Sequence, residues 1–182
     1  NRLSGWGWRS SSIAWLALLP QLLWAAVLTG QVVGISDGDT LKVLDANHQV
    51  HTIRLMGIDA PEKAQPFGQR AKQSLSALVF QQQVQVEWHK QDRYGRIVAV
   101  CLNGQQDVGA QLVRRGGAMA YRRYSERYVP AETAAKSEGL GIWSGSMETP
   151  EAYRHKDDPA PAEASDGCRI KGNVGSGGGR VY

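Results

Sequence analysis

The sequence predicts an α+β protein whose strands form a small β-barrel, and three observations support this class. Beyond Thr29, apolar and β-branched residues alternate with polar ones, and short polar turns divide the segment into strands. Apolar residues then recur at helical spacing between residues 67 and 80. A second pair of strands and two more helical segments follow, so strands and helices mix within one chain of 182 residues.

The first three predicted strands form an antiparallel meander. They cover residues 30–36, 39–45 and 49–59. The turn between the first two is "DGD", in which Gly38 is expected to supply a positive φ. The next turn contains Asn47 and is polar, as a hairpin connection requires.

A helix and a second hairpin follow the meander. The helix is predicted over residues 67–80, because Ala71, Leu75, Leu78 and Val79 lie on one face. The hairpin consists of strands over residues 84–88 and 96–102. Its turn lies at Tyr94 and Gly95.

Two shorter helices complete the predicted domain. The first, in "VGAQLVRRGGAMAY", is expected to end at Gly116 or Gly117. The second, in "YVPAETAAKSEGLGIW", has Pro130 near its first turn and Gly139 near its end. Three strands, a helix, two strands and two helices give a five-stranded OB-fold β-barrel with about three helices.

The two ends of the chain differ from this domain in composition. Residues 1–26 combine arginines with a short apolar run that ends in small residues, which is typical of a signal peptide or N-terminal anchor. We therefore expect export to the periplasm or the medium, with a membrane-anchored protein as the alternative. Residues 27–146 are the predicted domain, and residues 147–182 are a low-complexity tail that we do not expect to order itself.

The composition is that of a soluble globular protein, with 42% hydrophobic and 21% charged residues. The net charge of +4 permits a polyanionic partner such as nucleic acid and does not demand one. Cys101 and Cys168 lack the spacing of a zinc site. We expect neither a disulfide between them nor a metal site built from cysteine.

Acidic and basic side chains gather at the predicted strand ends. Asp39 starts the second strand and Asp59 ends the third, and antiparallel pairing brings such positions together. Converging carboxylates are costly unless a cation neutralises them, and calcium favours such oxygen ligands. Arg54 and Arg96 present planar forks that match phosphate oxygens. A metal and two guanidiniums around one anion would stabilise a phosphoryl transition state.

Over residues 29–144 the chain resembles the staphylococcal nuclease family. Each matching motif is short, but all five occur in the family's order and at compatible spacings. They are "DGDTLKV", "IRLMGIDAPE", "DRYGR", "LVRRGGAMAY" and "SEGLGIWS".

The resemblance implies a role for each residue of the acidic and basic set. Asp39 and Asp59 would bind calcium together with the backbone carbonyl of Ala60, and magnesium is the weaker expectation. Glu62 would orient or deprotonate the attacking water. Arg54 and Arg96 would hold the scissile phosphate, with Arg96 facing the leaving 5′ oxygen.

The resemblance also assigns three supporting residues. Tyr121 and Tyr124 would pack beside the bound nucleotide, and Asp37 would support the ligand Asp39 from the turn. Other arginines either contact the phosphate backbone or are simply solvated; these are Arg114, Arg115, Arg122 and Arg123. The chain departs from the family's best-known member in having Ala60 in place of Thr and a shorter loop at residues 62–68.

The resemblance implies a calcium-dependent phosphodiester hydrolase that cleaves DNA, RNA or both and leaves 3′-phosphate ends. We expect a monomer, infer no protein partner, and expect a membrane tether only if the N-terminal segment is retained. The alternative is a non-catalytic OB-type module that holds single strands by stacking and charge. The acidic set favours the enzyme, since a pure binder gains nothing from three carboxylates beside a polyanion.

Overall fold

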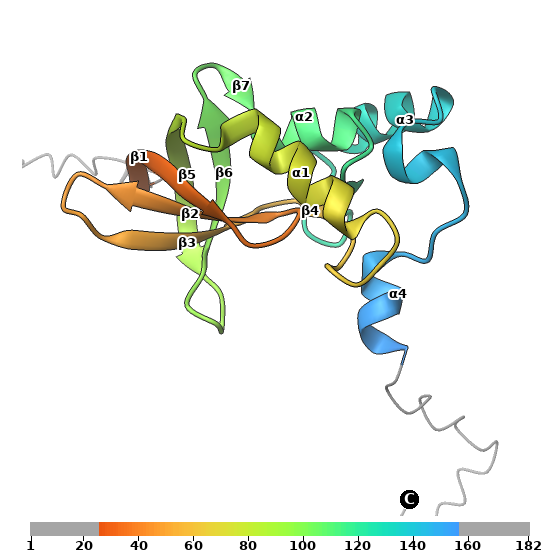
Figure 1. Ribbon diagram of the computed structural model, residues 1–182, viewed down its shortest axis with the longest axis horizontal. Coiled ribbons are helices and arrows are strands. Elements are labelled where there is room, and N and C mark those ends of the chain that lie inside the picture. The colour runs from red at the N-terminus through yellow and green to blue at the C-terminus, as the bar shows by residue number, and fades with distance from the viewer. Residues whose placement is uncertain (1–25, 157–182) are drawn as a thin grey trace, which may run out of the picture.

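The computed structural model describes residues 26–156, and all of the predicted signal peptide or anchor except Ala26 lies outside these residues. Figure 1 shows the strands gathered on one side of the molecule, α1 to α3 along the other, and α4 below them. The barrel strands are β1 (Ala26–Ile35), β2 (Thr40–Asp45), β3 (Val50–Leu55), β5 (Gln83–Gln91) and β6 (Ile97–Asn103). The short strands are β4 (Ile58–Asp59), β7 (Gln106–Asp107) and β8 (Met119–Ala120).

The main sheet closes on itself. Its strand order is β3-β2-β1-β5-β6-β7, and β3 also pairs with β6 in parallel through Ile53 with Ile97 and Leu55 with Ala99. The remaining ladders of the barrel are antiparallel. Closure leaves the five barrel strands without a free edge, and it confirms the predicted α+β class with an OB-type barrel.

The meander determines where the first acidic residue lies. β2 pairs with β3 so that Thr40 lies opposite Arg54. Asp39 therefore lies beside the end of β3, and its backbone carbonyl accepts a hydrogen bond from the Leu55 N–H at 2.9 Å.

A two-stranded sheet carries the second acidic residue. β4 pairs with β8, with Ile58 opposite Ala120 and Asp59 opposite Met119. The Tyr121 N–H continues this pairing by donating to the Gly57 carbonyl at 2.9 Å. Both strands are only two residues long, and the sequence pattern did not predict them separately.

The predicted helices are present within a few residues of their expected bounds. They are α1 (Gly68–Val79), α2 (Val108–Arg114) and α3 (Val129–Ser137), followed by a 3₁₀ turn, η1 (Gly141–Ser144). The helix before "RGGAMAY" was expected to end at Gly116 or Gly117. Gly116, with φ 68°, is the left-handed residue that follows α2, so it is the glycine at the helix end. The buried side chains of α1 and α2 pack on the barrel in one continuous core.

One expectation about the C-terminal segment is wrong within the part that the structure describes. Residues 150–155, expected to lie in a tail without order, form helix α4 (Pro150–His155). Pro150 is buried at its first turn, and the Thr149 hydroxyl caps it by accepting from the Ala152 N–H at 3.2 Å. Residues 157–182 lie outside the described structure.

Between residues 26 and 156, no helix has the length and apolar character needed to cross a membrane.

Candidate active site

The acidic turn between β1 and β2 is held by its own first aspartate. The Asp37 carboxylate accepts from the Asp39 N–H at 3.1 Å, and the Thr40 hydroxyl donates to the Asp39 carboxylate at 3.0 Å. The expected positive φ at Gly38 is absent. Glycine is required there for a different reason: an added Cβ would lie 2.7 Å from the Cβ atoms of both Ala60 and Ala71. The turn is thus pressed against the segment that carries Asp59.

Arg54 links the two predicted metal ligands. Its Nη1 lies 2.9 Å from Asp39 Oδ2, and its Nη2 lies 3.3 Å from Asp59 Oδ1. Nη1 also donates to the carbonyls of Leu55 and Ile58 at 3.0 and 3.1 Å, which fixes the guanidinium on the connection between β3 and β4. The structure therefore brings Asp39, Arg54 and Asp59 into one cluster.

Burial sets the electrostatics of this cluster. Burial raises the pKa of Asp39 to about 7; Arg54 acts to lower this pKa, while the neighbouring Asp37 acts to raise it. The Ala60 N–H donates to Asp39 Oδ2 at 3.0 Å and also favours the ionised form. A carboxylate in this setting is stabilised by any further positive charge placed beside it.

Glu62 belongs to the same cluster through a residue that the sequence analysis did not single out. Arg154, at the last turn of α4, places Nη1 2.8 Å from Glu62 Oε1. The same guanidinium donates to both oxygens of Asp59, at 3.1 Å to Oδ1 and 2.9 Å to Oδ2. Partial burial acts to lower the pKa of Arg154, but its hydrogen bonds to Asp59 and Glu62 outweigh burial, so the net pKa is raised.

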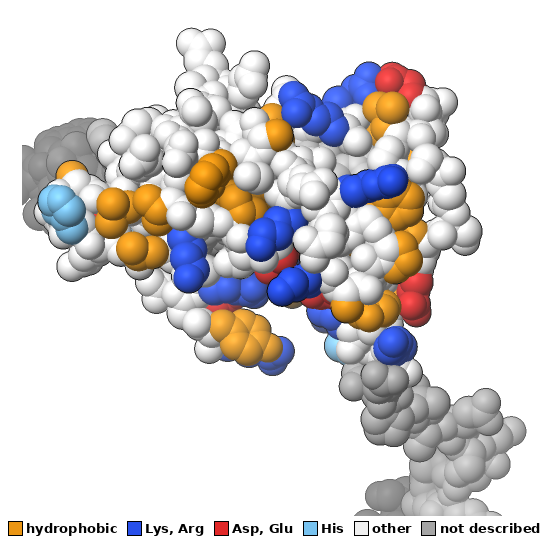
Figure 2. All heavy atoms as spheres, viewed as in Figure 1, with side chains coloured by type: hydrophobic (Ala, Val, Ile, Leu, Met, Phe, Trp, Pro, Cys, Tyr) orange, Lys and Arg blue, Asp and Glu red, His pale blue; other side chains and the backbone are white. Residues whose placement is uncertain are grey.

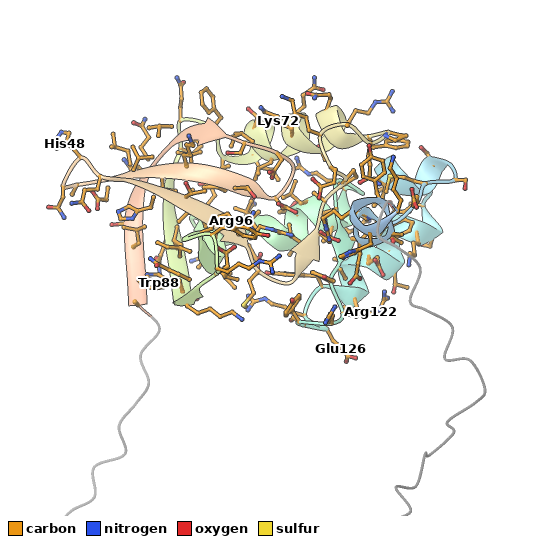
Figure 3. The ribbon with its side chains drawn as sticks, turned by 90° about the horizontal axis from the view of Figure 1, so that it is seen from below. His48, Lys72, Trp88, Arg96, Arg122 and Glu126 are labelled. Carbon is orange, nitrogen blue, oxygen red and sulfur yellow. The ribbon has the colours of Figure 1, made fainter. Side chains whose placement is uncertain are left out.

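Arg96 lies on the second hairpin and has a carboxylate partner of its own. Its Nε donates to Asp92 Oδ2 at 2.7 Å, and its guanidinium lies 5.4 Å from the centre of the Tyr94 ring. Seen from below, Arg96 lies near the middle of the molecule, between the strands and the helices (Figure 3). Among the described ion pairs it contacts Asp92 rather than Asp39 or Asp59.

Asp92 was also missed as a residue of the site. Partial burial acts to raise its pKa, but hydrogen bonds from Arg96 and from the backbone of the turn lower it by more, so the net pKa is below the usual value. Its position in "DRYGR", four residues before Arg96, is a signal that could have identified this ion pair.

The two predicted substrate tyrosines contact each other. The Tyr121 and Tyr124 rings meet edge to face, with their centroids 4.8 Å apart. Tyr124 is 63% exposed, and the Lys90 ammonium lies 5.9 Å from its ring.

The sequence left open whether four arginines contact phosphate or are solvated. Three of them have acidic partners: Arg114 pairs with Glu138, Arg122 with Glu132 and Arg123 with Glu151.

The donor chemistry of the cluster fits a hard cation, because its side-chain ligands are carboxylates alone. The described residues nevertheless gather no group of three or more acidic, histidine or cysteine side chains in a metal-binding arrangement. The protein side chains thus offer Asp39 and Asp59 as a pair, and backbone carbonyls and water would have to complete a calcium shell.

Figure 2 shows the character of this face: Lys and Arg side chains surround a small group of acidic ones between the barrel and α4. Buried carboxylates bridged by a guanidinium, inside a rim of positive charge and exposed aromatic rings, suit a polyanion whose phosphate is the reacting group. Fold and site together define a class of protein, the OB-fold phosphodiester hydrolases.

Comparison with known proteins agrees with this class. The family described as "Staphylococcal nuclease homologue" matches residues 52–145. An "Uncharacterized endonuclease" of Haemophilus influenzae is 42% identical over 118 residues, covering 64% of this chain and 66% of that protein. A "Micrococcal nuclease" of Shigella flexneri is 42% identical over 128 residues, covering 63% and 73%. An "Uncharacterized endonuclease" of Escherichia coli is 36% identical over 135 residues, covering 72% and 88%.

The chain belongs to the staphylococcal nuclease family. This confirms the family that the five motifs indicated, and it supports the predicted class of enzyme, a nuclease.

Proposed function

We propose that this protein is a calcium-dependent nuclease that hydrolyses phosphodiester bonds of DNA, RNA or both. One observation carries the proposal: Arg54 bridges two buried carboxylates, Asp39 and Asp59, at the point where the barrel meets the short β4–β8 sheet. Burying such a cluster costs free energy that a structural role alone does not explain. The cluster provides two carboxylates that can bind a cation and a fixed guanidinium that can bind a phosphate.

Asp39, Asp59 and the backbone carbonyl of Ala60 would hold the cation. Calcium is favoured over magnesium on the family resemblance. A bound divalent ion would supply Lewis-acid stabilisation of the charge that develops on the phosphate. The desolvated Asp39 carboxylate would gain a positive neighbour that offsets its burial.

The remaining residues act on water and phosphate. Glu62 would orient or deprotonate the attacking water. Arg54 is already fixed by two backbone carbonyls and would bind the scissile phosphate with little loss of side-chain freedom. Arg96 would exchange part of its contact with Asp92 for the phosphate on the side of the leaving 5′ oxygen, giving 3′-phosphate ends.

The tyrosine pair would hold the adjoining nucleotide. Tyr124 offers an exposed ring, and Tyr121 packs edge to face against it. A base can therefore stack on Tyr124, with Lys90 near the phosphate backbone of the bound nucleic acid.

The protein would act outside the cytoplasm. This part of the proposal rests on the arginines and apolar run of residues 1–26. Fractionation of cells that express the full chain tests it: recovery in the periplasm or medium supports export, recovery in membranes supports an anchor, and recovery in the cytoplasm refutes both.

The decisive experiment incubates the full chain with labelled single-stranded DNA, duplex DNA and RNA in calcium, in magnesium and in chelator. We expect cleavage in calcium that is lost in chelator and in Asp39→Ala, with 3′-phosphate ends on the products. Glu62→Gln should slow turnover by about 100-fold or more, as expected on removing a group that assists proton transfer. Binding without cleavage under every metal condition would instead establish a non-catalytic OB-type module.

A further inference from the structure

Helix α4 lies against the candidate active site. Its first turn is anchored by the buried Pro150. Just before the helix the Gln65 amide donates to the Glu148 carbonyl at 3.2 Å, and in its first turn Glu151 accepts from the Tyr121 hydroxyl at 3.4 Å. The helix therefore spans from the loop after β4 to the segment after β8, and both of these border the acidic cluster.

Arg154 is the residue that α4 inserts into this cluster. Its guanidinium donates to both oxygens of Asp59 and to Oε1 of Glu62, at distances from 2.8 to 3.1 Å. The Asp59 side chain is 5% exposed and that of Arg154 is 33% exposed. Such two-point, charge-assisted contacts are stronger than those of a single surface ion pair.

The groups that Arg154 binds are those with assigned roles in the proposed reaction. A divalent cation on Asp59 would contact its oxygens directly, at about 2.0–2.6 Å as calcium and magnesium do. Both oxygens of Asp59 already accept from Arg154, and one of them also accepts from Arg54. A divalent charge added at the same carboxylate would repel the guanidinium and compete for the same lone pairs.

We propose that Arg154, which also holds Glu62, competes with the divalent cation for Asp59, and that α4 is an internal inhibitor that leaves the cluster when the metal binds. The proposal rests on the metal site of the proposed function. Because the same guanidinium holds Glu62, its departure would free this carboxylate for the attacking water at the moment the metal is bound.

Two of the other described contacts of α4 are long, and both involve Glu151. The helix has only six residues, and Pro150 is the one that is buried. A further described ion pair joins Arg123 and Glu151 at 3.4 Å between side chains that are well exposed, and pairs of this kind contribute little. Among the described contacts of α4, those of Arg154 are the ones that reach the acidic cluster.

Calcium titration by calorimetry tests the competition, using the full chain without nucleic acid. Arg154→Gln removes the guanidinium, and we expect it to bind calcium about tenfold more tightly, the loss of one strong competing contact. Arg154→Lys keeps the charge without the two-point geometry, and its calcium affinity should lie between those of the wild type and Arg154→Gln. Arg114→Gln changes the net charge equally, but Arg114 pairs with Glu138 and not with the cluster. The calcium affinity of this variant should equal that of the wild type.

Hydrogen exchange at the Tyr153 amide, which donates to the carbonyl of the N-cap residue Thr149, reports the release of α4. In the wild type, calcium should accelerate this exchange. In Arg154→Gln, exchange should be fast with or without calcium. The Glu132 amide of α3 should exchange at the same rate in every case and serves as the internal reference.

The outcomes separate this inference from the function on which it rests. Equal calcium affinity in the wild type and Arg154→Gln, or an unchanged Tyr153 exchange rate on adding calcium, would overturn the competition and leave the metal site standing. Absence of calcium binding in every variant would refute the metal site, and the competition with it. Tighter binding confined to Arg154→Gln and Arg154→Lys would establish the competition.

Discussion

Among single side chains, Arg54 connects most of the candidate site. It contacts Asp39 and Asp59 and is itself held by two backbone carbonyls, so its position is determined by the strand connection. A guanidinium makes all of these contacts with one rigid plane, whereas an ammonium is a point charge.

Arg54→Lys should therefore impair the enzyme although the charge is kept. We expect kcat/KM to fall by about 100-fold, the usual cost of removing one fixed donor from a transition state. Steady-state hydrolysis of a short labelled oligonucleotide measures it. Arg93→Lys, on the exposed hairpin turn, is the matched control and should change kcat/KM only slightly. Similar activity in both variants would remove Arg54 from its proposed role.

Gly38 is the second single position with a clear requirement. In Gly38→Ala the new Cβ would lie 2.7 Å from two other Cβ atoms, so the turn or α1 must move. We expect the free energy of unfolding to fall by about 1–3 kcal/mol, as in other overpacked cores. Urea denaturation measures it. Gly34→Ala is the control, because its Cβ would meet only the Lys42 side chain at 3.5 Å or more. Equal losses in both variants would contradict this explanation.

Among the elements, α2 begins at a carboxylate that also binds two residues at the start of α3. Asp107 caps the helix by accepting from the Ala110 N–H at 3.0 Å. It also accepts from the Tyr128 hydroxyl at 3.0 Å and pairs with Arg127 at 2.9 Å. One side chain thus joins β7, α2 and the start of α3.

Asp107→Ala should lower the free energy of unfolding by about 2 kcal/mol, since a helix cap and a buried hydroxyl lose their acceptor together. Thermal and urea unfolding provide the measurement. Asp107→Asn keeps an acceptor for the cap and should lose less. A loss in Asp107→Asn as large as in Asp107→Ala would show that charge, rather than hydrogen bonding, dominates.

The elements also show which parts of the structure the sequence can predict. Strands β1 to β3 and helix α1 followed from period-two and period-3.6 patterns, because each buries one face on the core. β4 and β8 are too short to carry a period. α4 was missed because local composition disfavours order, while the stabilising contacts come from residues far away in the chain.

The same distinction applies to the candidate site. Strand pairing was enough to predict that Asp39 and Asp59 come close, although Asp59 lies on β4 rather than at the end of the third strand. Glu62 was placed with them by the family resemblance, and in the structure it joins the cluster through Arg154. Arg154 comes from a distant segment, and no local pattern connects it with Asp59. The contact required at Gly38 was likewise misread, since a close approach to Ala60 and Ala71 depends on tertiary packing.

For the molecule as a whole, the net charge of +4 and the basic rim predict salt-sensitive binding of nucleic acid. Measured with Glu62→Gln in calcium, the affinity for a single-stranded oligonucleotide should fall steeply between about 50 and 200 mM salt. A fluorescence anisotropy titration at several salt concentrations gives the slope. An affinity independent of salt would argue against phosphate contacts and in favour of stacking as the main source of binding.

The parallel pairing of β3 with β6 has a consequence for the rate of refolding. It joins Ile53 to Ile97, which are separated in the chain by α1 and β5. This ladder therefore forms only after a long loop has closed, and loop closure costs conformational entropy. Proteins rich in such distant pairings refold more slowly than helical ones of similar size. After dilution from denaturant, helical circular dichroism should therefore recover first, and the ability to cleave nucleic acid should return only with the last strand.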